Sequence, residues 1–161
     1  MKVLGIDPGT GRTGWAIVEK DGGKEKLLEC GCLETKAHTP LPDRLKKIYQ
    51  KVSDLIKKHE PSEAAIEKIF FSKNVRTAMS VGHARGVVLL ACRLADIEIF
   101  SYGPSQIKSS VTGYGNAPKK QVQEMVKSIL NLKEVPKPDD AADAVAVALT
   151  HLAIPPALRE N

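Results

Sequence analysis

The opening stretch of the chain constrains its fold more than any other segment. An apolar run over residues 3–6 ends in the carboxylate of Asp7. Pro8 then removes a backbone donor from the strand ladder, and Gly9 frees the backbone to turn. A second apolar run covers residues 15–18. The pattern predicts two strands joined by a turn, with an acidic side chain at the end of the first strand.

Asp7 has two interpretations at this point. An Asp-Pro-Gly sequence is common turn chemistry, with Asp7 as the first residue of a type I turn. Alternatively, Gly9, Gly11 and Gly14 keep the backbone open, so that a bulky polar ligand could approach the carboxylate. Other acids that converge on Asp7 would favour the second interpretation.

Composition sets broad limits on the class of protein. A chain of 161 residues with 42% hydrophobic content is expected to form one domain with its own core. No apolar window reaches the length of a membrane span, and the first 30 residues lack a signal-peptide pattern, so a cytoplasmic protein without a membrane partner is expected. The three cysteines form no zinc or disulfide pattern. A net charge of +5 is compatible with a polyanionic partner and also with ordinary solubility.

The rest of the chain alternates strand and helix patterns, which indicates an α/β fold. The expected elements are a hairpin at 21–23 that returns as a strand over 26–34, a helix capped by Asp43 and ended by Pro61, a strand over 64–71, a helix over 75–95 capped by Asn74, a strand over 97–102, a helical turn over 104–112, a helix over 117–130 and a last helix over 139–153. The first three strands are expected to form an antiparallel meander.

The strand over 64–71 carries a single acid, Glu67, in a run that is apolar apart from Glu67 and Lys68. That side chain either belongs to a salt bridge near the strand edge or emerges at the end of the sheet, where a cation can meet it. Phe70 and Phe71 follow. Both can be core residues, but successive side chains point to opposite faces of a strand, so one is also a candidate for stacking on a base.

Cationic side chains gather around the glycine-rich loop at 113–116. Lys119 and Lys120 begin the helix that follows this loop, and Lys108 lies just upstream. Together with the free N–H groups of a helix N-terminus they form a candidate phosphate-binding patch. A surface loop with incidental lysines explains the same residues equally well.

The last helix has the sequence DDAADAVAVAL, whose small residues predict close packing on the sheet. Asp139 is a natural cap, and Asp140 and Asp143 share one face of the helix. All three could be acids favoured by the helix dipole. Asp143 fits that explanation worst because it lies deeper in the apolar helix.

Taken together, the acids suggest a cation-binding site. Asp7, Glu67 and the acid pair of the last helix would repel one another in a partly desolvated cluster, and divalent cations would relieve that repulsion. Oxygen ligands without His or Cys suit Mg²⁺ or Mn²⁺, and two such ions can act on a phosphodiester bond.

The chain resembles the Holliday-junction resolvases of the RuvC family, within the ribonuclease H-like superfamily. The similarity extends over essentially the whole chain and rests on the order and spacing of the segments GIDPGTGRTGWAI, AAIEKIFFSKN, GHARGV, GYGNAPKKQVQ and DDAADAVAVALTH. The resemblance implies a ribonuclease H-like fold with a five-stranded mixed sheet flanked by helices. It also implies a nuclease domain over residues 1–154 and a short tail over 155–161.

The same resemblance implies an activity and the residues responsible for it. The expected enzyme is an endonuclease that resolves four-way DNA junctions in recombination and repair by paired symmetric nicks. Two Mg²⁺ per active site are expected, with Mn²⁺ able to substitute, and the partners are junction DNA, a second copy of the chain and a branch-migration motor complex. The catalytic and metal-binding acids fall on Asp7, Glu67, Asp140 and Asp143, and the DNA-contacting residues on Phe70, Lys108 and Lys119.

The dimer also has a candidate seam in the sequence. Two nicks placed symmetrically about a junction call for two active sites, which an isologous dimer provides. The helix over 75–95 is the candidate because small and apolar residues cluster in it, namely Val81, Gly82, Gly86, Val88 and Leu89.

Two other classes of protein remain open on the sequence. A nucleotide-binding domain of the actin and sugar-kinase kind has a phosphate loop similar to residues 6–10, although such ATPases need two lobes. A catalytically silent junction-binding module would retain the same shape with structural acids. ATP titration and a metal-dependent cleavage assay distinguish these classes from a nuclease.

Overall fold

The computed structural model describes residues 1–69 and 75–159, with the side chains of residues 75–77 excepted. Phe70, Phe71 and Asn74 therefore lie outside the described residues. Within the described ranges the strands are β1 (Lys2–Asp7), β2 (Arg12–Asp21), β3 (Lys24–Glu34), β4 (Glu63–Glu67) and β5 (Glu98–Tyr102). The helices are α1 (Leu41–His59), α2 (Val75–Leu94), α3 (Pro104–Thr112), α4 (Lys119–Ile129) and α5 (Asp139–Ala153), followed by a short 3₁₀ helix, η1 (Pro156–Leu158).

The strands form one mixed sheet in the order β3-β2-β1-β4-β5. β1, β2 and β3 are the predicted antiparallel meander, whereas β4 and β5 run parallel to β1. The prediction of a five-stranded mixed sheet is confirmed for the described part of the chain. Because β1 and β4 are parallel neighbours, the residues at their carboxyl ends meet at the same edge of the sheet.

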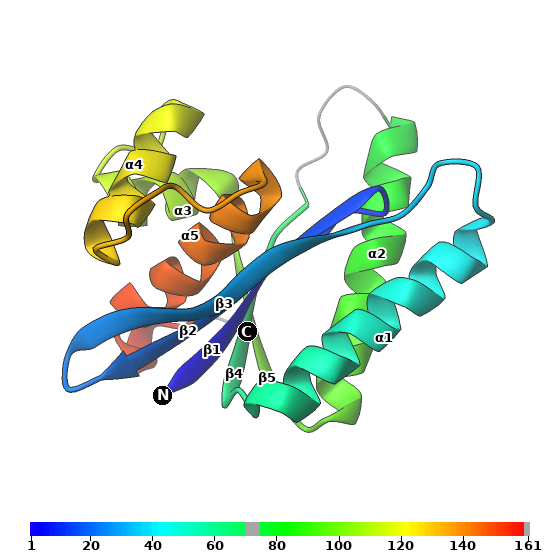
Figure 1. Ribbon diagram of the computed structural model, residues 1–161, viewed down its shortest axis with the longest axis horizontal. Helices are drawn as coiled ribbons and strands as arrows, with labels where there is room; N and C mark the ends of the chain where they lie inside the picture. Colours follow the sequence, from blue (N-terminus) through cyan, green and yellow to red (C-terminus); the bar gives the residue numbers. More distant parts are fainter. Residues whose placement is uncertain (70–74, 160–161) are drawn as a thin grey trace.

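Helices cover both faces of the sheet (Figure 1). α1 and α2 lie on one face, and α3, α4 and α5 lie on the other. Alternate residues of β1 are divided between the two cores, with Leu4 and Ile6 facing α1 and α2 and Val3 facing α5. Each face of the sheet therefore packs against its helices through a separate hydrophobic core.

α5 lies directly on the backbone of β1. A Cβ atom added to Gly5 would stand 2.3 Å from the carbonyl oxygen of Ala144 and 2.8 Å from the Cβ of Ala148. Only a glycine opposite a helix of small residues permits so close an approach. The alanine-rich composition of α5 thus brings its first turns, with their acids, up to the strand ends.

Two capping predictions and one strand boundary need correction. α1 begins at Leu41 with Pro40 in the capping position, and α5 begins at Asp139 with Pro138 in that position. Asp43 and Asp139 are therefore first-turn residues rather than caps, where their charges still favour the helix dipole. β4 ends at Glu67 rather than continuing through residue 69, so Glu67 is the last residue of its strand.

A buried polar network links the end of β5 with the start of β4 through α5. The Tyr102 hydroxyl donates to Nδ1 of the fully buried His151 at 2.6 Å, and Nε2 of His151 donates to the Glu63 carboxylate. Arg159 also contacts that carboxylate, at 2.7 Å, so this part of the tail is bound to the domain. In the part of the chain that the structure describes, no helix is both long and apolar enough to cross a membrane.

One helix face remains uncovered in the monomer. Met79, Leu90 and Leu94 of α2 are 54–65% exposed, and a Cβ added to Gly86 would meet nothing within 4 Å. Val88, which the sequence placed near a dimer seam, is fully buried in the core beneath α2. Leu89 also packs against that core. Val88 therefore cannot contact a second copy of the chain.

Candidate active site

Two acids from adjacent parallel strands form the centre of the site. The register pairs Ile6 of β1 with Ile66 of β4, and the next residues along the two strands are Asp7 and Glu67. The two carboxyl groups are hydrogen bonded to each other. Because one carboxyl must be protonated to donate, this pair holds a proton between its members.

The electrostatics of the pair follow from burial and crowding. Burial raises the pKa of Asp7 to about 6, the hydrogen bond from Glu67 opposes this rise, and the negative charges of Asp143 and Asp140 add to it. Burial and the charge of Asp7 raise the pKa of Glu67 to about 8. The pair therefore retains a proton at neutral pH. The two titrate as a coupled unit.

α5 contributes two further acids to the cluster. Burial raises the pKa of Asp143, and its carboxylate also contributes to the raised pKa values of both Asp7 and Glu67. Asp140, one turn earlier, contributes to the raised pKa values of Asp7 and Asp143. The spacing of three residues places both carboxylates on the same side of the helix, toward the strand ends.

β2 connects the acid of β1 with the first acid of α5. Gly14 pairs with Asp7 in the antiparallel ladder, and a Cβ added to Gly14 would stand 1.9 Å from the carbonyl oxygen of Asp140. The sequence suggested that this glycine leaves space for a ligand. In the structure the first turn of α5 fills that space, so Gly14 serves to bring Asp140 close to Asp7.

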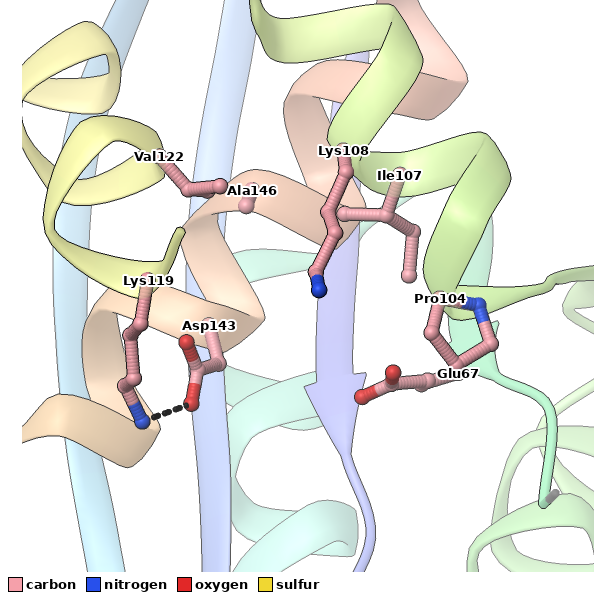
Figure 2. Close-up of a pocket in the computed structure, with 8 residues that line it drawn as sticks. All are labelled: Glu67, Pro104, Ile107, Lys108, Lys119, Val122, Asp143 and Ala146. Carbon is pink, nitrogen blue, oxygen red and sulfur yellow. Dashed lines mark hydrogen bonds and ion pairs between the residues drawn. The ribbon is translucent and has the colours of Figure 1, made fainter. Parts of the chain in front are cut away.

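Two lysines and two of the acids line a pocket of about 230 Å³ beside the strand ends. Figure 2 shows Lys108 from α3 pointing into the space between Glu67 and Asp143. Lys119, the first residue of α4, donates from Nζ to Asp143 at 2.8 Å and lies 3.5 Å from Asp139. The lysines of the predicted phosphate patch thus line the same pocket as the acids.

The acids fit a divalent cation by their chemistry. They offer carboxylate oxygens only, which suits Mg²⁺ or Mn²⁺, and they crowd closely enough to retain a proton that a cation would replace. Across residues 1–69 and 75–159, however, no three His, Cys, Asp or Glu side chains are close enough together to hold a metal ion as placed. Two of the acids are paired with cationic side chains instead, Asp143 with Lys119 and Asp140 with Arg12.

The structure brings most of the predicted site residues together. Asp7, Glu67, Asp143, Lys108 and Lys119 surround one region at the carboxyl ends of β1 and β4. Asp140 lies beside them, with its carboxylate engaged by a side chain of β2. Phe70 falls outside the described residues, so its contact with DNA stays a prediction.

Sequence reasoning missed the contribution of β2 to this site. Arg12 reaches both Asp140 and Glu34, and Gly14 sets the approach of α5 to β1. A signal for the contact between Arg12 and Glu34 was available, because these opposite charges lie at similar distances on either side of the predicted turn at 21–23. The small residues of the last helix predicted close packing on the sheet, but they did not indicate that its first turn would meet Gly14.

Comparison with known proteins relates this arrangement to one family. The model of the family described as crossover junction endodeoxyribonuclease RuvC matches residues 3–151. Curated proteins of that name from Finegoldia magna and Brevibacillus brevis are 53% and 50% identical to the chain. Each match covers 94% of the chain, and 93% and 91% of the respective relatives.

Solved structures agree with these sequence matches. A structure of RuvC from Thermus thermophilus in complex with a Holliday junction substrate superposes with a TM-score of 0.90 at 38% identity, covering 94% of this chain and 93% of that one. The yeast mitochondrial Holliday junction resolvase Ydc2 superposes with a TM-score of 0.65 at 15% identity, covering 94% of this chain and 78% of that one. The second likeness extends to the fold alone.

Proposed function

Since the chain belongs to the RuvC family of crossover junction endodeoxyribonucleases, we propose that its carboxyl cluster hydrolyses phosphodiester bonds at the crossover of a four-way DNA junction. The enzyme is a structure-selective endonuclease that resolves Holliday junctions in recombination and repair. The observation that supports this site most directly is the hydrogen-bonded pair of Asp7 and Glu67 at the ends of adjacent parallel strands, with Asp143 beside them.

The family consists of metal-dependent nucleases, and we assign the metal ligands to the four acids. Asp7, Glu67, Asp140 and Asp143 would hold two Mg²⁺ ions, with Mn²⁺ able to replace them. Such ions, when bound, lower the pKa of water and neutralise charge on the phosphate and the leaving oxygen. Oxygen-only ligation and the raised pKa values of Asp7 and Glu67 support this assignment.

The side chains of this protein have their own tasks in that scheme. Glu67 must release the proton that it shares with Asp7 before both carboxylates can act as ligands. Lys119 neutralises Asp143, and when a phosphate enters the pocket its ammonium group can contact that phosphate instead. Lys108 points into the same pocket and is assigned to the DNA backbone. Phe70 is assigned to base stacking near the crossover.

A second copy of the chain would complete the enzyme. Two symmetric nicks require two clusters related by a two-fold axis, and the exposed apolar face of α2 is the proposed seam. Met79, Gly86, Leu90 and Leu94 follow one another at intervals of seven, four and four residues, which places them along one side of the helix. These residues replace Val88 and Leu89 in the seam. The branch-migration motor complex, and the division into a domain over 1–154 and a tail over 155–161, stay predictions.

A cleavage assay tests the proposed function. Purified protein is incubated with a four-way junction and with linear duplex of the same sequence, with Mg²⁺ and with EDTA. We expect paired nicks on opposite arms of the junction, in the presence of Mg²⁺ only, and none on the linear duplex. Equal cleavage of both substrates, or cleavage in EDTA, would contradict the proposal. ATP titration without binding would set aside the nucleotide-binding alternative.

A further inference from the structure

We propose that Arg12 is a positioning residue that competes with a divalent cation for Oδ2 of Asp140, so that a cation binds this oxygen more tightly once the guanidinium group has left it. The inference rests on the proposed function, because it assumes that Asp140 is a metal ligand. The inference assigns to Arg12, a residue of β2, an influence on how tightly the site binds a cation.

The first support is the geometry of the guanidinium group. Nη1 of Arg12 lies 3.3 Å from Oδ2 of Asp140, and Nη2 lies 2.6 Å from Oε1 of Glu34. Arg12 and Glu34 are direct cross-strand partners in the hairpin of β2 and β3. One cationic side chain is thus shared between two carboxylates, and the shorter contact is the one outside the acid cluster.

The second support is the fixed backbone of Asp140. Its main chain packs against Gly14 so closely that a single added methyl group would overlap it. The backbone of Asp140 therefore cannot move closer to β2, and on this side the carboxylate adjusts by reorienting its side chain. The contact with Arg12 restricts the reorientation of the Asp140 side chain. While the guanidinium group holds Oδ2, a cation that approaches Asp140 must displace it or use the other carboxylate oxygen.

The third support is the difference between the two cation-held acids. Asp143 is paired with Lys119, a residue that lines the pocket itself and can remain there when ligands change. The Arg12 side chain is 53% exposed, and Glu34 offers it a second partner away from the cluster. Release of Asp140 therefore leaves Arg12 with a hydrogen-bonded position and exposes no unpaired buried charge.

The effect on metal affinity should be modest and should have opposite signs in two variants. Exposed ion pairs of this kind shift an equilibrium by up to roughly fivefold. Arg12→Gln removes the competitor, so the dissociation constant for Mn²⁺ should fall about two- to fivefold. Glu34→Gln removes the alternative partner of Arg12, so the dissociation constant should rise by a similar factor. Arg12→Lys keeps the charge and should lie near the wild type.

The experiment is a calorimetric titration of Mn²⁺ into each DNA-free protein, with folding checked by melting temperature. The double variant Arg12→Gln/Glu34→Gln separates a direct competition from a general field effect. If Glu34 acts through Arg12, the double variant matches Arg12→Gln. If Glu34 acts only through its charge, it weakens binding equally in both backgrounds, and the proposal is overturned.

A control variant and a failure criterion complete the test. Lys24→Gln removes one positive charge from the far end of the same hairpin, about 33 Å away along an extended strand, and should leave the affinity unchanged. If the wild type binds Mn²⁺ but Arg12→Gln binds with equal or lower affinity, the inference about Arg12 is wrong. If the wild type binds no Mn²⁺, or Asp7→Asn binds it as well as the wild type does, the proposed metal site itself is wrong.

Discussion

Glu67→Gln is expected to stabilise the metal-free protein and to abolish its nuclease activity. Burial and the neighbouring charge of Asp7 raise the pKa of Glu67 from 4.5 to about 8. The folded protein therefore retains a proton that the unfolded chain has already released at neutral pH. At this group the native state binds more protons than the unfolded state, so the contribution of Glu67 to stability is most favourable at low pH and falls as the pH rises from about 4.5 to 8.

The size of the effect follows from the same pKa values. Each pKa unit corresponds to about 1.4 kcal/mol, so between pH 4.5 and pH 7 the raised pKa of Glu67 removes at most about 3 kcal/mol of stability. A glutamine at this position cannot ionise, and its amide can still donate to Asp7. For a domain of this size each kcal/mol corresponds to roughly 2–4 °C in melting temperature. We expect Glu67→Gln to melt about 3–10 °C above the wild type at pH 7 in EDTA.

The assay compares melting temperatures at pH 5, 6, 7 and 8, in EDTA and in Mg²⁺. The difference in melting temperature between Glu67→Gln and the wild type should shrink toward pH 5. Mg²⁺ should raise the melting temperature of the wild type more than that of the variant. Glu124→Gln makes the same chemical change on an exposed face of α4 and serves as the control. If Glu67→Gln in EDTA melts at or below the melting temperature of the wild type at every pH, ionisation of Glu67 does not destabilise the folded protein and the reasoning is wrong.

Three further predictions concern cleavage, DNA binding and assembly. Asp7→Asn and Asp140→Asn should each abolish cleavage in saturating Mg²⁺ and retain junction affinity in gel-shift titrations, because phosphate contacts elsewhere position the DNA; wild-type turnover would remove that acid from the site. Lys108→Ala and Lys119→Ala should each reduce the slope of log affinity against log salt by about 0.9, and an unchanged slope would mean that the lysine makes no phosphate contact. Gly86→Glu should sediment as a folded monomer that nicks poorly, because its side chain enters open space on one chain but meets the partner in a dimer; a dimeric variant would relocate the seam.

Much of the fold could be predicted because the local patterns agree with the tertiary structure. The bounds of α3 and α5 match the structure, and the meander of the first three strands follows from apolar runs separated by turn residues. The caps expected at Asp43 and Asp139 were wrong because a proline precedes each helix and takes the capping position. A proline supplies the fixed backbone angle without a capping side chain, and the acid then moves into the first turn.

The acids could be predicted as a group, whereas their electrostatic partners could not. Asp7 lies at the end of an apolar run and Glu67 lies within one, and a charged residue in such a place is informative in the sequence itself. Their shared proton depends on the parallel pairing of β1 with β4, which joins segments 60 residues apart. Lys119 and Asp143 meet only because α4 packs beside α5. These contacts are set by packing between elements rather than by local pattern.

Gly14 shows most directly why part of the site could not be read from the sequence. A glycine after a strand-ending acid is compatible with space for a ligand and with close packing of another element, and both interpretations require the absence of a side chain. The choice between them depends on where α5 lies, which is decided by the alanines of that helix and by Gly5 on the neighbouring strand. Once α5 is in contact with Gly14, Asp140 comes within reach of Arg12 as well as of Asp7. The position of this acid is therefore fixed by backbone contact, and its charge is balanced by a side chain of the strand against which it packs.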